Sequence, residues 1–172
     1  VVEARVARDA SLAKLAAFGV SKTDLESFSG RHIARQKFDP TKRDQLKTEA
    51  ANGDPAVLAL RCAVEYSATP DGIPDWEGAR EICEAAASAG EPAAHVYYGH
   101  LLSDAAVYAM SDEERAGIEA SATAEFRKAA EKDFGWGQIE YGWRLREGKG
   151  APANPAEAET LFKAAQARGM PA

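Results

Sequence analysis

The 172-residue sequence predicts an all-α fold, a solenoid of antiparallel helix pairs. Three observations predict it. Helix start and stop signals recur along the whole chain and allow about nine helices. Similar helix ends return at a period of roughly 35–45 residues, which is typical of helical repeats. Finally, β-branched residues nowhere alternate at period two, so the pattern does not favour strands.

The predicted helices begin at side chains that can cap them. An Asp or Asn before a proline places a side-chain acceptor ahead of the first helical position, and a Ser or Thr three residues before a Glu has the spacing of a capping box. In chain order these starts are Thr23…Glu26, Asp39-Pro40, Asp54-Pro55, Ser111…Glu114 and Asn154-Pro155. Glycine tolerates the left-handed conformation that ends a helix. The predicted ends are Gly53, Gly90, Gly148 and Gly169.

The helix junctions share one design, in which an alanine-rich helix end is followed by a short polar break and a new helix with small residues. It occurs in residues 48–60, 85–99, 126–142 and 162–172. Such self-similarity favours a repeat array, in which each helix pair packs on its neighbours. We expect an N-terminal helical cap region over residues 1–53 and an array over residues 54–172. The expected repeats are about 54–91, 92–135 and 136–172.

The third copy, residues 137–169, resembles a Sel-1-like repeat, a branch of the tetratricopeptide superfamily. The matching positions are Gly137, Tyr141-Gly142, Leu145, Gly148-x-Gly150, Asn154 and Lys163-Ala164-Ala165. The other two copies are degenerate. The first has Cys62-Ala63 where the family has Leu-Gly, Tyr66 as its aromatic residue and Asp75 as the cap of its second helix; the second contains an insertion around residues 104–115. The resemblance implies a right-handed superhelix.

Composition excludes several classes of function. The net charge is −6, with a net of +3 in residues 1–50 and −9 in the remainder. An acidic main body argues against a nucleic-acid partner, which needs a clustered basic face. No apolar run approaches the roughly 20 residues of a membrane-spanning helix. The chain begins at Val1 without a methionine, so we expect a processed protein or a segment of a longer one.

Motifs that suggest chemistry do not have the required context. Gly142 and the Gly148-Lys149-Gly150 run have the wrong spacing for a phosphate-binding loop and fit a helix-packing contact and a helix end instead. The sequence Asp133-Phe134-Gly135 lacks the other kinase motifs. His95 and His100 are five positions apart, too far around a helix to share a metal. We therefore expect no catalytic residues, no metal and no cofactor.

The two cysteines leave two alternatives open. In an antiparallel pair, Cys62 and Cys83 would meet at the same height, because they lie at similar distances from the turn between their helices. Buried free thiols are the more common case. A disulfide within the first repeat would imply an oxidising compartment. A bacterial periplasm or envelope is slightly favoured over the cytoplasm.

The resemblance implies that the first helix of each repeat lines a concave face where a protein or peptide partner binds. The exposed positions implied by the repeat pattern are Leu60, Val64, Ser67, Ala68, Val96, His100, Ser103, Asp104, Ile139, Trp143, Arg146 and Glu147, with Trp136 one turn earlier. Trp and Arg are favoured at binding hot spots. The alternative is that Trp136 and Trp143 pack against a terminal helix or a further repeat.

The resemblance implies a non-enzymatic interaction module or adaptor, of the kind found in bacterial envelope assembly, secretion, signalling or effector immunity. A hydrolase or ligand-binding protein acting on cell-wall-like molecules is the second hypothesis, and a structural spacer is the third. The array ends on a repeat junction at residues 169–172. We therefore expect either further repeats beyond it or a homodimer formed through an uncapped repeat face. No membrane insertion is expected.

Overall fold

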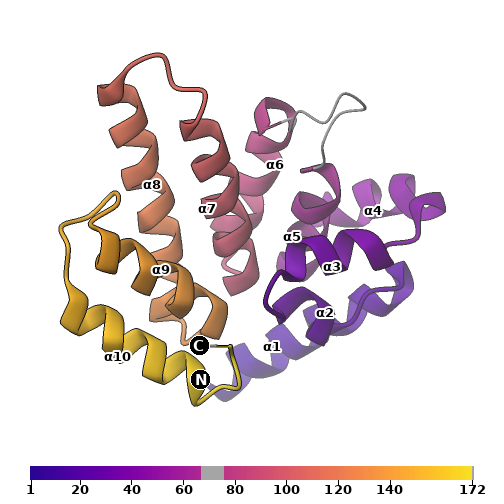
Figure 1. Ribbon diagram of the computed structural model, residues 1–172. Coiled ribbons are helices and arrows are strands. Elements are labelled where there is room, and N and C mark those ends of the chain that lie inside the picture. Colours follow the sequence, from indigo (N-terminus) through magenta and orange to yellow (C-terminus); the bar gives the residue numbers. More distant parts are fainter. Residues whose placement is uncertain (67–75, 172) are drawn as a thin grey trace. The chain divides into compact units, whose positions relative to one another are not determined.

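All regular structure is helical in residues 1–66 and 76–171, the part of the chain that the computed structural model describes. These residues form ten α-helices and two 3-10 helices (Figure 1), which confirms the predicted all-α class. The elements are α1 (Val2–Ala13), η1 (Lys14–Phe18), α2 (Lys22–Glu26), α3 (Gly30–Lys37), η2 (Pro40–Lys42), α4 (Arg43–Ala50), α5 (Pro55–Glu65), α6 (Trp76–Ser88), α7 (Pro92–Ala106), α8 (Asp112–Glu131), α9 (Gly135–Glu147) and α10 (Pro155–Gln166).

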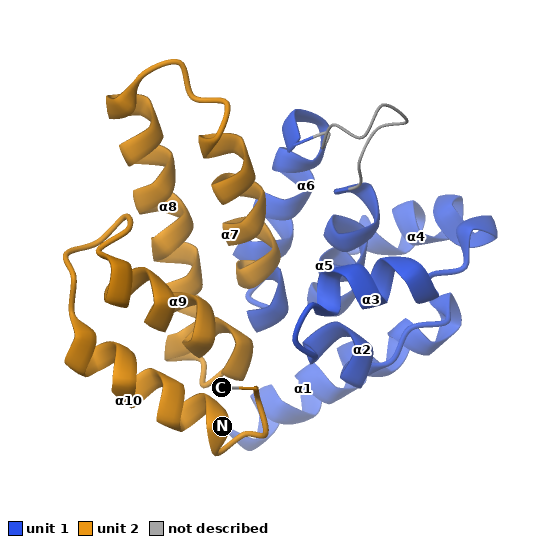
Figure 2. Ribbon diagram, in the orientation of Figure 1, with its two compact units in different colours: residues 1–94 blue, residues 95–172 orange. Residues whose placement is uncertain are grey.

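The chain divides into two compact units, unit 1 over residues 1–94 and unit 2 over residues 95–172 (Figure 2). The division falls within the first turn of α7, close to the predicted start of the second repeat. The cap region and the three repeat boundaries stay a prediction. No helix among the described residues is long and apolar enough to cross a membrane.

Most of the predicted helix starts are capped as expected. Asp54, Ser111 and Asn154 each accept a hydrogen bond from the backbone N–H three residues later. The predicted capping box at Thr23…Glu26 is wrong: Ser21 and Asp24 form the box instead, and Thr23 lies inside α2. The hydroxyl of Ser21 accepts from the Asp24 N–H, and the carboxylate of Asp24 accepts from the Ser21 N–H. Two overlapping signals of equal spacing compete here, and the earlier one wins.

The four glycines predicted to end helices all have positive φ angles. They are Gly53, Gly90, Gly148 and Gly169, with φ of 77°, 91°, 67° and 79°. An L-residue rarely adopts this conformation, so glycine is what allows each helix to end there.

Unit 1 is built around α5, which packs against α1, α3, α4 and α6. The first 50 residues supply a large part of this core, because the side chains of Leu15, Leu25 and Leu46 have no exposed surface. Apolar burial of this kind is the dominant favourable term in folding. The N-terminal region therefore covers α5 on several sides.

Unit 2 brings its helices together at glycines. A Cβ atom on Gly99 of α7 would lie 2.6 Å from the Phe126 ring of α8, and one on Gly142 of α9 would lie 2.7 Å from the Phe162 ring of α10. Each missing side chain thus leaves room for an aromatic ring of the partner helix. The close approach predicted for Gly142 is confirmed.

Candidate functional site

The partner-binding residues predicted for the first repeat are buried where the structure describes them. Leu60 and Val64 are 0% and 2% exposed, so their prediction as exposed partner-binding residues is wrong. Both lie on α5, which α1, α3, α4 and α6 cover. The prediction failed because the repeat pattern took no account of residues 1–53. Ser67, Ala68 and Asp75 lie outside the described residues.

In α9, Trp136 and Ile139 are also buried, at 4% and 6% exposure. The Trp136 ring lies 6.0 Å from that of Tyr97 and 5.4 Å from that of His100, and its Nε1 donates to Glu140 at 3.0 Å. A buried tryptophan with a satisfied N–H is part of the core. Trp136 is therefore a packing residue and not part of an open concave face. Its ring partners are in the earlier helix α7, not in a terminal helix or a further repeat as the alternative had it.

His100 and Asp104 of α7 are half-buried. His100 Nε2 lies 3.2 Å from Glu140 Oε1, and the His100 ring meets the Phe126 ring edge-on. Burial alone would raise the pKa of Glu140, but hydrogen bonds to His100 and Trp136 and the charge of His100 outweigh it and lower that pKa. His100 thus connects α7, α8 and α9, so only part of its side chain is available to a partner. Val96, on the same helix, is buried.

Of the predicted positions, Trp143, Arg146 and Glu147 of α9 lie open to solvent. The exposed fraction of Trp143 is 42%, and Arg146 is exposed as well. The Arg146 guanidinium lies 3.6 Å from the centroid of the Trp143 ring, and the Phe162 ring of α10 meets that ring edge-on at 5.7 Å. A cation over an indole face is a favourable contact. The three residues, Trp143, Arg146 and Phe162, form what we call the tryptophan platform.

Cys62 and Cys83 are joined by a disulfide that connects α5 to α6 in unit 1. Both residues are fully buried, and their Cα atoms are 4.7 Å apart. The structure therefore contains the pairing that was the less common of the two alternatives.

Unit 2 contains a buried ion pair that the sequence did not indicate. His95 Nδ1 lies 2.7 Å from Glu125 Oε2, and Lys128 donates to the other carboxylate oxygen of Glu125 at 2.6 Å. Burial alone would raise the pKa of Glu125, but the hydrogen bonds and charges of His95 and Lys128 hold it below its ordinary value. The sequence could indicate only the Glu125–Lys128 contact, whose residues are three apart on one helix. His95 is on a different helix, so no local spacing indicates its contact with Glu125.

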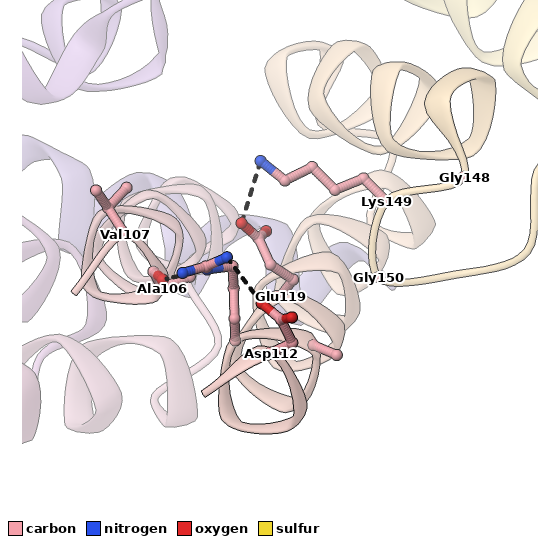
Figure 3. A pocket seen from close by; sticks show the side chains of 9 residues that line it. Ala106, Val107, Asp112, Glu119, Gly148, Lys149 and Gly150 are labelled. Atoms are coloured by element: carbon pink, nitrogen blue, oxygen red, sulfur yellow. Dashed lines mark hydrogen bonds and ion pairs between the residues drawn. The ribbon is translucent and has the colours of Figure 1, made fainter. Parts of the chain in front are cut away.

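The Gly148-Lys149-Gly150 turn, whose glycines also suggested chemistry, borders a cleft of about 610 Å³ in unit 2. The walls come from the end of α7, the first half of α8 and this turn (Figure 3). At its base, Glu119 pairs with buried Arg144, and Lys149 lies 3.1 Å from the same carboxylate. These partners come from distant parts of the chain, and no spacing in the sequence indicates them. Among the described residues, no group of three or more His, Cys, Asp or Glu could hold a metal ion.

The fold of this chain is similar to that of a solved repeat protein. A crystal structure of a Sel1 repeat protein from Oxalobacter formigenes superposes with a TM-score of 0.59 at 26% sequence identity, covering 74% of this chain and 91% of that one. No family model matches the sequence, and no curated protein does. The chain has a Sel1-like repeat fold, as the repeat in residues 137–169 predicted.

Proposed function

We propose that this chain, whose fold is that of a Sel1-like repeat protein, is a non-enzymatic interaction module that binds a protein or peptide partner. The fold supports this proposal, because repeat proteins of this kind offer extended surfaces to their partners. The more specific elements, a bacterial adaptor role in the envelope, secretion, signalling or effector immunity, are part of the proposal. The bacterial origin of the similar structure supports a bacterial source for this chain.

The observation that carries the proposal is the tryptophan platform. A tryptophan that is 42% exposed leaves a large apolar surface in water, and covering it on binding would be strongly favourable. Arg146 and Phe162 already hold the Trp143 ring from two sides. A side chain that is ordered before binding loses less conformational entropy in the complex. Tryptophan and arginine are also the residues most enriched at energetic hot spots.

The proposed binding surface is therefore smaller than the sequence pattern implied. It comprises Trp143 and Arg146, with His100 and Asp104 as half-buried candidates. A homodimer through the repeat face beyond α10 remains a further prediction. Sedimentation velocity over a range of concentrations tests it.

The disulfide is the feature from which we infer the compartment. We expect Cys62 and Cys83 to be oxidised in the native protein, which favours the periplasm or envelope over the cytoplasm.

The experiment that tests the proposed function is affinity capture from the source organism with matched variants. Wild-type protein, Trp143→Ala and Arg146→Glu are compared with two controls, Phe28→Ala and Arg127→Glu, which change exposed residues that are not part of the platform. We expect the wild type and both controls to capture the same partner, and both platform variants to lose it while keeping their helical circular dichroism. Equal capture by the platform variants would show that the platform is not the binding surface.

A further inference from the structure

The cleft beside α8 is separate from the tryptophan platform and has its own chemistry. We call it the α8 cleft, defined by Ala106, Arg115, Glu119, Lys149 and Gly150. In Figure 3 the Lys149 side chain reaches across toward Glu119 at the base, on the side away from Asp112. A concave site with a few convergent polar groups is where ligands bind most often.

Two cations of the α8 cleft can exchange their present partners. The side chains of Arg115 and Lys149 are 49% and 48% exposed. Arg115 pairs with Asp112, whose side chain is 98% exposed, and an exposed pair of this kind is weak. Lys149 shares Glu119 with Arg144, so Glu119 keeps a buried cation when Lys149 moves away. Neither exchange leaves a buried charge without a partner.

The turn that carries Lys149 is held in place. The Thr123 hydroxyl donates to the Lys149 carbonyl at 2.9 Å. Gly150 has a φ of 69°, and a Cβ there would collide with the Glu119 carbonyl oxygen. The backbone of the turn therefore packs directly on α8, and the ammonium group projects from a fixed base.

One exposed apolar side chain lines the same cleft, and a second follows it in the connection between α7 and α8. Val107, which lines it, is 70% exposed, and Met110 in the same connection between α7 and α8 is 96% exposed. Apolar surface beside two exchangeable cations matches a ligand that carries an acid next to an apolar group.

We propose that the α8 cleft binds an extended acidic peptide segment. A carboxylate of the segment lies between Arg115 and Lys149, and a neighbouring apolar side chain packs on Val107. Charge favours an acidic over a basic segment, because Glu119 is already neutralised by Arg144 and the other lining acid, Asp112, is at the open rim. The proposal does not depend on the tryptophan platform and concerns a second surface.

Fluorescence polarisation with a labelled peptide amide, Ala-Leu-Asp-Glu-Leu-Ala, tests the proposal. We expect saturable binding to the full chain and a Kd that is about fivefold weaker for Lys149→Ala and for Arg115→Ala, the loss typical of one ion pair at a partly exposed site. Lys163→Ala on α10, which removes an exposed lysine elsewhere, should bind like the wild type. In ¹⁵N-labelled protein, the amides of Gly148 and Gly150 should shift on binding.

Two comparisons test whether the α8 cleft prefers an acidic peptide over a basic one. Asp112→Asn removes the acid beside Arg115. This variant should therefore bind the acidic peptide several-fold more tightly, a gain about as large as the contribution of one surface ion pair. The matched peptide with Lys-Lys in place of Asp-Glu should not bind. Absence of saturable binding by the wild type, an unchanged Kd for Lys149→Ala, or preference for the Lys-Lys peptide would each overturn the proposal.

Discussion

The helix pairs α5/α6 and α9/α10 are held together by different means. In α5/α6 a disulfide joins Cys62 to Cys83. In α9/α10 the Phe162 ring packs on Gly142. One contact is covalent and depends on oxidation, whereas the other depends on a side chain that is missing. Two antiparallel helices of this fold can thus be closed either by a disulfide or by a ring packed on a glycine.

The largest difference should appear on reduction. The disulfide closes a loop with a sequence separation of 21 residues, and a bridge of this span stabilises by about 3 kcal/mol. We expect urea unfolding of the wild type in the presence of a strong reductant to show a loss of this size, confined to unit 1. Hydrogen exchange followed by mass spectrometry can assign the loss to α5 and α6 rather than to α9 and α10.

A control decides whether the bond exists in the native protein. Because both cysteines are buried, the protein is alkylated in denaturant without reductant, and its intact mass should stay unchanged. Modification of two thiols would show that both cysteines are free. Both helix pairs would then be held by packing alone, without a covalent bond.

The next effect should come from filling the glycine contact. Gly142→Val places methyl groups where the Phe162 ring lies, and overpacking of this kind costs about 1–3 kcal/mol. Because the ring is the obstacle, Gly142→Val combined with Phe162→Ala should recover part of the loss. The free energy of unfolding of the four proteins in this double-mutant cycle measures the coupling. Additive losses would mean that Gly142 and Phe162 do not pack as the structure shows.

The smallest effect should be a response to acid that unit 2 owes to its histidine–glutamate pairs. The pKa values of Glu125 and Glu140 are lowered below the ordinary 4.5. The unfolded chain therefore takes up these protons first, so the stabilisation is present above pH 4.5 and is lost as the pH falls through the lower folded values. Glu125→Gln with Glu140→Gln should flatten the acid dependence of hydrogen exchange in α8 and α9. An unchanged slope would contradict the assignment.

Local features of this fold could be predicted from the sequence, because their causes lie within one turn of helix. Asp54, Ser111 and Asn154 cap the helices that follow them, and each cap joins residues three apart. Glycine at a helix end needs no distant partner either. The wrong capping box near Thr23 shows the limit of this reasoning, since two equal local signals overlap there.

Features that depend on segments outside one helix pair could not be predicted. Leu60 fits the pattern of a concave face, but the first 50 residues of the chain supply much of the core around its helix. Trp136 and Trp143 are the same residue type in the same helix. Trp136 is a core residue only because Tyr97 and His100 of α7 pack on its ring. The network of Glu119, Arg144 and Lys149 likewise joins residues from separate elements. Amphipathic patterns tell which face is apolar, not what covers it.

The most direct test of the central claim is the affinity of a purified captured partner for Trp143→Ala, measured by calorimetry against Phe28→Ala. Both substitutions remove an aromatic ring of similar exposure, 42% and 44%. We expect Trp143→Ala to lose at least about 2 kcal/mol of binding free energy, the size of a hot spot, and Phe28→Ala to lose none. Equal affinities for the two variants would contradict the central claim.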